Sequence, residues 1–373
     1  MAARVLLAAV TALHGLIHLL GPAKAFGWAD VPLTGRMGVA LGVAWLLVAV
    51  LVLLVGVLIA TGARGWWVGA LVAAVGSQVV IATSWSDARA GTVPNVLLVL
   101  AGLYGFAAHG PTSFEAEYRR RRRVAGPPVA AVPVIEADLD RLPAPLATYL
   151  RRTGAVDQPA VTSFQCMSVG RIRSGPRARW MTFTGEQFNT GGTEPTRLFH
   201  MDATMFGLPV DVLHVFDDGG ATMRVKLLSV LPMVNAAGPD MDRAETVTIF
   251  NDLCVLAPAA LVHAPVDWTA VDERRVRGTF HRGRISVDAE LRFDESGDLI
   301  DFVSDDRLRA DRDGKRFTQQ RWSTPLSGYR CFQRQRIAGH GEGRWHAAPP
   351  EGEFTYLEFN VRRIDYDPEE GRR

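Results

Sequence analysis

Five consecutive arginines, Arg119-Arg120-Arg121-Arg122-Arg123, separate two parts of this 373-residue chain that differ sharply in composition. The chain has 41 basic and 39 acidic residues, but only five and two of these lie in residues 1–110. Residues 111–373, which include the run, carry the remaining 36 basic and 37 acidic residues and are therefore nearly neutral, which argues against a general nucleic-acid binder. Five adjacent guanidinium groups repel one another and must be solvated. The sequence thus predicts an apolar region, a charged boundary and a water-soluble domain.

Four segments before the run are long and apolar enough to cross a membrane: residues 5–21, 37–60, 66–83 and 95–109. The second has no charge in 24 residues, which is enough to span about 30 Å of hydrocarbon. The first has a signal peptide as its rival interpretation, because Arg4 precedes its apolar stretch. We favour a retained helix because further spans follow. Residues 1–110 are therefore predicted to form a four-helix transmembrane module.

Residues 111–135 are predicted to form a basic juxtamembrane run and a Pro/Ala-rich linker. Arginines beside a span are attracted to anionic lipid headgroups at roughly 1 kcal/mol per charge, so Arg119 to Arg123 are candidates for headgroup contacts. Basic flanks also stay in the cytoplasm. With four spans, one side carries the run together with Arg4 and Arg64, and the other carries Lys24, Arg36 and Arg89. This count predicts a multi-pass protein of the cell membrane whose soluble domain is cytoplasmic.

Two histidines, His14 and His18, share one face of the first predicted helix because they are four residues apart. Ionisable groups inside a span are candidates for function, here as metal or haem ligands or as a proton relay. We favour neutral imidazoles that hydrogen-bond to Ser77, Gln78 or Asn95, because two histidines are too few ligands for a metal site. No cofactor is predicted.

Beyond Gly154 the apolar residues alternate with polar ones, which is the period of a strand with one buried face. The pattern is clearest in residues 285–293, which a turn joins to residues 299–309 as a hairpin. Similar runs occupy residues 161–172, 178–187, 196–205, 210–217, 221–231, 266–282, 327–337 and 352–366. Such closely spaced strands predict a mainly β (α+β) domain over residues 136–373. Its centre is one large curved antiparallel sheet, shaped as a half-open barrel.

One segment, near residues 242–257, has helical rather than strand periodicity. Asp242 and Glu245 have the spacing of a capping box. The apolar stripe that follows consists of Ala244, Val247, Phe250, Leu253, Leu256 and Ala257. A lone amphipathic helix in a β domain is expected to lie across the concave face of the sheet.

No motif in the sequence fixes a reaction. Asp240, Asp242 and Glu245 are candidates for acid/base chemistry, but carboxylates are also typical of the first turn of a helix. The acidic stretch at 305–313 lacks the glycine that a calcium loop needs. An odd number of cysteines gives no disulfide framework and no cluster of zinc ligands. These cysteines are Cys166, Cys254 and Cys331. The balance leans away from an enzyme.

Several segments resemble an uncharacterised bacterial membrane-protein family, in which a four-helix membrane module is joined to a soluble domain of unknown function. The membrane segments are HGLIHLLG at 14–21, SQVVI at 77–81 and WSDA at 85–88. Those of the soluble domain are LPAPLATYL at 142–150, WMTF at 180–183, GPDMD at 238–242, PAAL at 258–261 and WTAVD at 268–272. The resemblance implies the two-part architecture and no activity. The order of elements is also similar to the lipoprotein-carrier fold, in which a half-open sheet surrounds an apolar cavity.

These features favour a membrane-anchored protein whose soluble domain binds a lipid or another hydrophobic molecule. A half-closed sheet would leave some aromatic and aliphatic side chains around a pocket. The candidate ligand-binding residues are Trp180, Phe183, Phe250, Leu253, Leu256 and Trp268. One alternative is a membrane-embedded enzyme or redox or proton-relay protein that uses His14 and His18. A third is a scaffold or sensor that recruits a protein.

Overall fold

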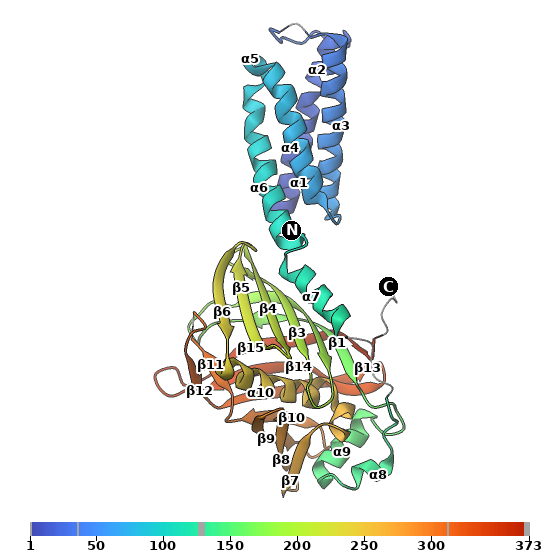
Figure 1. Ribbon diagram of the computed structural model, residues 1–373, viewed down its shortest axis with the longest axis vertical. Helices are drawn as coiled ribbons and strands as arrows, with labels where there is room; N and C mark the ends of the chain where they lie inside the picture. The colour runs from blue at the N-terminus through green and yellow to red at the C-terminus, as the bar shows by residue number, and fades with distance from the viewer. Residues whose placement is uncertain (1, 36, 126–130, 312, 369–373) are drawn as a thin grey trace. The chain divides into compact units, whose positions relative to one another are not determined.

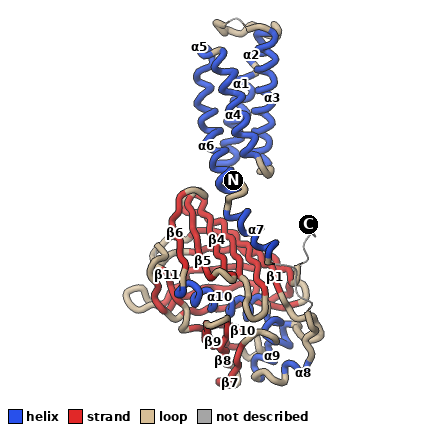
Figure 2. The backbone as a smooth tube through the Cα atoms, viewed as in Figure 1, coloured by secondary structure: helices blue, strands red, loops and turns tan. Residues whose placement is uncertain are grey.

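The computed structural model describes residues 2–35, 37–125, 131–311 and 313–368. Arg36 and linker residues 126–130, on which part of the predictions above depends, lie outside the described residues. The chain divides into two compact units, Met1–Ala116 and Glu117–Arg373. Figures 1 and 2 show that the first unit is helical and that the second is dominated by strands.

The first unit is built mainly from long apolar helices. Its helices are α1 (Ala2–His18), α2 (Leu20–Ala25), α3 (Val39–Thr61), α4 (Trp66–Thr83), α5 (Trp85–Ala88), the 3-10 turn η1 (Arg89–Gly91) and α6 (Thr92–His109). Small residues let them approach closely: a Cβ added at Gly42 would lie 2.2 Å from the Cβ of Ala25. The described residues contain four helical segments long and apolar enough to cross a membrane.

The two histidines lie in a hydrogen-bonded network inside this unit. His14 Nε2 lies 3.0 Å from both Ser77 Oγ and Asn95 Oδ1, and His18 Nε2 lies 2.9 Å from Ser77 Oγ. Because an amide oxygen only accepts, His14 Nε2 carries the proton. His18 Nδ1 donates to the carbonyl of His14, so its Nε2 accepts from the Ser77 hydroxyl. The predicted bonds to Ser77 and Asn95 are confirmed. No described group of three or more His, Cys, Asp or Glu could hold a metal ion.

The arginine run is helical, although the sequence analysis assigned no element to it. It forms the C-terminal half of α7 (Phe114–Val124). Glu117 accepts from Arg121, one turn away, and also pairs with Arg224 of the sheet at 2.8 Å. Tyr118 is buried. The second unit then continues through the short helices α8 (Glu136–Leu139) and α9 (Ala144–Thr153).

The centre of the second unit is a 13-stranded antiparallel sheet with the order β6-β5-β4-β3-β2-β1-β15-β14-β13-β10-β9-β8-β7. The bounds are β1 (Ser163–Ile172), β2 (Met181–Thr190), β3 (Arg197–Met205), β4 (Leu208–Asp217), β5 (Gly220–Leu227), β6 (Leu231–Ala237), β7 (Val266–Asp272), β8 (Arg275–Arg282), β9 (Ile285–Phe293), β10 (Leu299–Ser304), β13 (Trp322–Phe332), β14 (Gln335–His346) and β15 (Glu353–Tyr366). A separate pair is formed by β11 (Leu308–Ala310) and β12 (Phe317–Gln319). The sheet is not closed, as predicted.

Some strand limits differ from the sequence analysis for identifiable reasons. The run 266–282 is two strands, because the chain turns between Asp272 and Arg275, where the Asp272 carboxylate accepts from the Arg274 amide. The predicted run 327–337 is too short: it covers the end of β13 and the start of β14, and these strands extend beyond it on both sides. Pro325 within β13 is the residue that hides this strand, since proline usually argues against a strand interior.

Helix α10 (Pro239–Leu256) crosses the inside of the curved sheet, as predicted (Figures 1 and 2). It contacts β5 and β6 near one edge and β9, β10 and β14 further along the sheet, so the sheet curves around it. The proposed Asp242 cap is wrong: the helix begins after Gly238, whose φ of +99° suits glycine, and Pro239 occupies the first turn. Asp242 instead accepts from the amide of Ala221.

The C-terminal end of α10 is buried, so its last carbonyls need partners. The hydroxyl of Tyr149 donates to the carbonyl of Cys254 at 2.9 Å, and that of Tyr366 donates to the carbonyl of Leu256 at 2.8 Å. The 3-10 turn η2 (Pro258–Val262) then leads to β7. These contacts join α9 and β15 to α10 and fix the helix within the main hydrophobic core.

A partly buried carboxylate on β10, that of Asp301, makes the stability of this unit depend on pH. Burial raises the pKa of Asp301 to about 6, and its Oδ1 has no hydrogen-bond partner among the described residues. The folded state therefore binds this proton more tightly than the unfolded state, and its stability falls as pH rises from about 4 to about 6. We expect Asp301→Asn to be more stable than wild type by roughly 2 kcal/mol at pH 7. Denaturant titrations at pH 7 and pH 4 should show this advantage shrinking at pH 4, and an equal difference at both would contradict it.

Candidate functional site

The second unit has a partly open cavity of about 1130 Å³ between α10 and the concave face of the sheet. Its wall is formed by inward-facing side chains of β1 to β5, by β13 to β15, and by one side of α10. Ligand pockets in proteins typically measure about 300–1,000 Å³. The cavity therefore has room for a large hydrophobic molecule.

Strand register gives this cavity a polar end and an apolar end. Cross-strand pairing arranges the inward side chains of β2 to β5 in rows two residues apart. The polar end starts at Arg197, and its next row is Gln187, Phe199, His214 and Met223. The apolar rows are Gly185, Met201, Val212 and Val225, followed by Phe183, Ala203, Val210 and Leu227. At about 3.3 Å per residue, Arg197 and Ala203 are roughly 20 Å apart along β3.

A buried ion cluster occupies the polar end. The Arg197 guanidinium donates from Nε to Asp252 at 2.7 Å and from Nη1 to Glu245 at 2.9 Å. Gln187 and Asn189 also donate to Asp252, at 2.6 and 3.2 Å. The exposed fractions are 7% for Arg197, 1% for Glu245 and 6% for Asp252. One guanidinium therefore bridges two carboxylates that lie two helical turns apart on α10.

The two carboxylates of this cluster have pKa values shifted in opposite directions. Burial alone would raise the pKa of Glu245, but Arg197, His214 and Arg307 together hold it well below its usual range. Burial raises the pKa of Asp252, and the attraction of Arg197 offsets only part of that. Glu245 is therefore the firmly charged member of the pair. Its other oxygen, Oε1, lies 3.7 Å from His214 Nδ1 and 3.6 Å from Arg307 Nη2.

Several buried polar atoms along this wall have no hydrogen-bond partner among the described residues. They are His214 Nδ1, Asn251 Oδ1, Arg307 Nε, Trp322 Nε1 and Thr324 Oγ1. All five residues line the cavity. Buried polar groups are nearly always hydrogen-bonded, so a cluster of unpartnered ones around a cavity is typical of a binding site.

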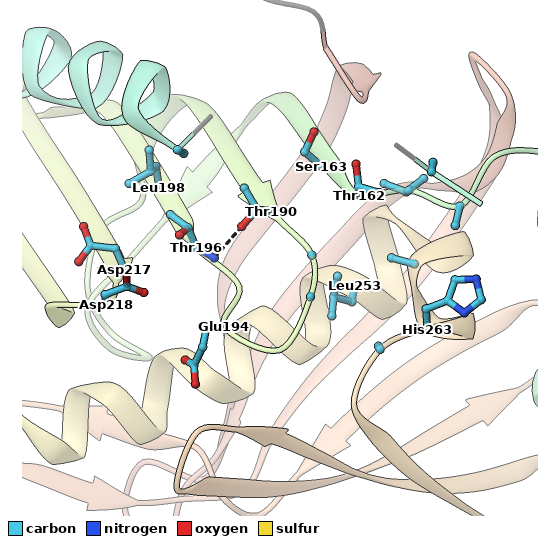
Figure 3. Close-up of a pocket in the computed structure, with 18 of the residues that line it drawn as sticks. Thr162, Ser163, Thr190, Glu194, Thr196, Leu198, Asp217, Asp218, Leu253 and His263 are labelled. Carbon is cyan, nitrogen blue, oxygen red and sulfur yellow. Dashed lines mark hydrogen bonds between the residues drawn. The ribbon is translucent and has the colours of Figure 1, made fainter. Parts of the chain in front are cut away.

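A second cavity of about 1050 Å³ is lined in part by the turn of the β2–β3 hairpin. Figure 3 shows its labelled polar residues, with Thr196 donating its amide to Thr190 Oγ1 at 2.9 Å. The acidic residue Asp217 on this wall pairs with Arg121 at 2.6 Å. Among the described residues that line this cavity, one buried polar side-chain atom, Ser163 Oγ, has no hydrogen-bond partner, against five around the larger cavity, so the second cavity is the weaker candidate.

The residues proposed from sequence for ligand binding are distributed over several environments. Phe183 and Leu256 line the larger cavity, and Leu253 lines the smaller one. Phe250 stacks on Phe280 at 5.3 Å and contacts Trp268 at 5.8 Å, within the aromatic part of the core. Trp180 lies between two guanidinium groups, those of Arg171 and Arg173, each 4.5 Å from its ring.

The five arginines proposed for headgroup contact form a mostly solvated helix end. Arg119, Arg120 and Arg123 are exposed. Arg121 pairs with Glu117 and Asp217, and Arg122 lies 5.7 Å above the ring of Phe188. Part of the run therefore packs on the sheet of its own unit.

The polar end of the cavity was not predicted from the sequence. Its signal is visible in β3, where Arg197 shares one face with the apolar residues Phe199, Met201 and Ala203. A charged residue on an otherwise apolar strand face requires a buried partner. Asp252 and Glu245 were the available partners, since a spacing of seven residues places both on one side of a helix.

A family model describes most of the second unit. Residues 133–359 match the family of unknown function DUF6544. The chain belongs to this family. The membership of this DUF6544 protein agrees with the resemblance of its soluble part to a domain of unknown function. No curated protein matches the chain.

Two solved structures are remotely similar to this DUF6544 protein. The first is a DUF1329-family protein from Desulfovibrio piger, with 14% identity and a TM-score of 0.35 over 60% of this chain and 92% of that one. The second is a putative outer membrane lipoprotein-sorting protein domain from Vibrio parahaemolyticus, with 10% identity and a TM-score of 0.32. That match covers 55% of this chain and 85% of the other.

Proposed function

We propose that this DUF6544 protein binds a lipid or another hydrophobic molecule in the cavity between α10 and the sheet. The observation that carries the proposal is the cavity of about 1130 Å³ with two apolar rows on one side. Phe183, Met201, Ala203, Val210 and Val212 form a buried apolar cluster of their own, apart from the main core. Binding an apolar molecule there is favourable because it removes the apolar side chains of the wall from water.

We further infer that the four helices of the first unit anchor the protein in a membrane. Their length and composition support this, as does the internal satisfaction of polar groups such as His14 and Asn95. The arginine count supports a cytoplasmic second unit. Reporter enzymes fused after Tyr366 and active only in the cytoplasm or only outside it would test the orientation. Activity of the external reporter would refute it.

The proposal is tested by mass spectrometry of the small molecules that remain bound to a purified fragment starting at Glu117. This fragment lacks the apolar helices, so lipid bound around them is excluded. We expect a hydrophobic species at close to one molecule per chain. A fragment that is folded by circular dichroism and carries no such molecule, even after incubation with cell lipid extract, would refute the proposal.

A further inference from the structure

We infer that the polar end of the cavity binds an anionic headgroup, a carboxylate or a phosphate, with Arg307 and the indole of Trp322 as donors. The ligand would then be an anionic amphiphile rather than a neutral lipid. This inference rests on the proposed function, because it assigns the chemistry of a molecule held in the same cavity. It concerns Arg307 and Trp322, whose N–H groups form no hydrogen bond with the ion cluster of Arg197.

Arg307 is a largely buried cation with one hydrogen-bond donor, Nε, that no described residue fills. Its side chain is 12% exposed, and its nearest carboxylate oxygen, Glu245 Oε1, lies 3.6 Å from Nη2. Its Nε has no partner in the described part of the chain. Glu245 already accepts from Arg197 at 2.9 Å through its other oxygen. The guanidinium of Arg307 is thus held in position by charge but remains available for a planar two-point contact with an anion.

Trp322 and Thr324 extend this donor group along β13. The Cζ of Arg307 lies 5.6 Å from the ring of Trp322. Trp322 and Thr324 are two residues apart and therefore share one face of the strand. They are 4% and 1% exposed, and both Trp322 Nε1 and Thr324 Oγ1 are without partners among the described residues. An indole N–H can only donate, so the group it meets must be an acceptor.

The chemistry of these donors favours an anion over a neutral oxygen. A guanidinium offers five N–H groups and cannot lose its charge. The Glu245 carboxylate beside Arg307 is shared with Arg197, so an anion would add negative charge where a neutral ester or hydroxyl would add none. One acceptor, Asn251 Oδ1, also lines the wall and suits a hydroxyl of a larger headgroup. A headgroup at this end would point its chain toward the apolar rows, which extend roughly 20 Å away along β3.

The test uses the full-length protein in amphipol and two photoactivatable probes that differ only in the headgroup, diazirine-oleate and diazirine-oleyl alcohol. Cross-linked peptides are mapped by mass spectrometry. We expect both probes to label peptides of the cavity wall, with oleate labelling at concentrations at least tenfold lower, as expected for one charge-assisted contact. Competition by lysophosphatidic acid against oleate then distinguishes a phosphate from a carboxylate headgroup.

Two variants and a control connect this preference to the named residues. Arg307→Met should reduce the preference for oleate over oleyl alcohol about tenfold. Trp322→Phe replaces the indole with a smaller ring that has no N–H and should reduce the preference several-fold. Arg275→Met removes an arginine that is paired with Asp272 on the surface, and it should leave the preference at the wild-type value. Thermal melting of each variant shows whether it is folded. If Arg307→Met does not fold, Trp322→Phe alone tests the inference.

The outcomes separate the inference from the proposed function. If oleyl alcohol labels the wild-type cavity as well as oleate, the anionic site is refuted while the hydrophobic cavity stands. The same conclusion follows if folded variants keep the full preference. If neither probe labels the cavity wall, the proposed function itself fails.

Discussion

Arg197→Leu is expected to lower the free energy of unfolding of the second unit by about 3–5 kcal/mol, the typical cost of breaking a buried ion pair. The substitution leaves Glu245 and Asp252 buried without their common cation. Asp252 can take up a proton, since burial already raises its pKa, but Glu245 loses Arg197, the strongest of the three groups that hold its pKa low. Denaturant titration followed by tryptophan fluorescence measures the loss.

Two further variants show whether the charge, rather than the packing, is responsible. The triple variant Arg197→Leu, Glu245→Gln, Asp252→Asn has no buried charge left at these positions and should recover a large part of the lost stability. Arg275→Leu breaks an exposed pair with Asp272 and should cost under about 1 kcal/mol. If the single and triple variants were equally unstable, Arg197 would act through its packing alone.

The ion cluster also explains how a hollow domain keeps its shape. An apolar wall alone would favour collapse of α10 onto the sheet, because atoms that line an empty volume lose van der Waals contacts. Charged groups with specified partners restrict that movement: Arg197 ties β3 to two positions on α10, and Arg243 pairs with Asp306 near β10. Burying these charges costs free energy, but the resulting ion pairs hold α10 away from the sheet and keep the cavity open.

Sequence periodicity was sufficient for the architecture and insufficient for the site. The alternation of apolar and polar residues in stretches such as 285–293 indicates a strand with one buried face. The helical spacing of Phe250, Leu253 and Leu256 identified α10. Both signals are local. Whether Phe183 faces a cavity and Phe250 faces a packed core depends on how β2 and β8 curve around the helix, which no local pattern contains. Aromatic residues therefore identified the interior without separating the wall of the cavity from the core.

The polar end was missed for a related reason. Arg197, Glu245 and Asp252 are distant in sequence, and each has an ordinary local interpretation: a strand end for Arg197 and helix-start or solvated carboxylates for the other two. Only the pairing of β3 with β4 and the position of α10 bring them together. The unpartnered N–H of Trp322 is likewise visible only from the contacts around it.

Filling the apolar end of the cavity should remove hydrophobic ligand with little effect on folding. Val212 and Ala203 are buried inward residues of adjacent rows on β4 and β3. The double variant Ala203→Trp, Val212→Trp places two indole rings in the volume that an apolar chain would occupy. Because the rings enter open space, overpacking should cost less than the about 1–3 kcal/mol typical of a filled core. We expect the amount of hydrophobic molecule retained after purification to fall at least tenfold, or about 1.4 kcal/mol in binding free energy.

The matched control is Thr184→Trp, which adds the same ring to the exposed face of β2 between Phe183 and Gly185. It should retain the wild-type amount of ligand, measured by mass spectrometry of the extracted molecules. A folded double variant that still carries a full complement would mean that the hydrophobic molecule binds elsewhere. A double variant that loses ligand while the ion cluster remains intact would instead show that the apolar rows supply most of the affinity. Arg307 would then chiefly determine which headgroup binds. Buried apolar area contributes to the binding free energy of any chain, whereas a charged donor discriminates between headgroups.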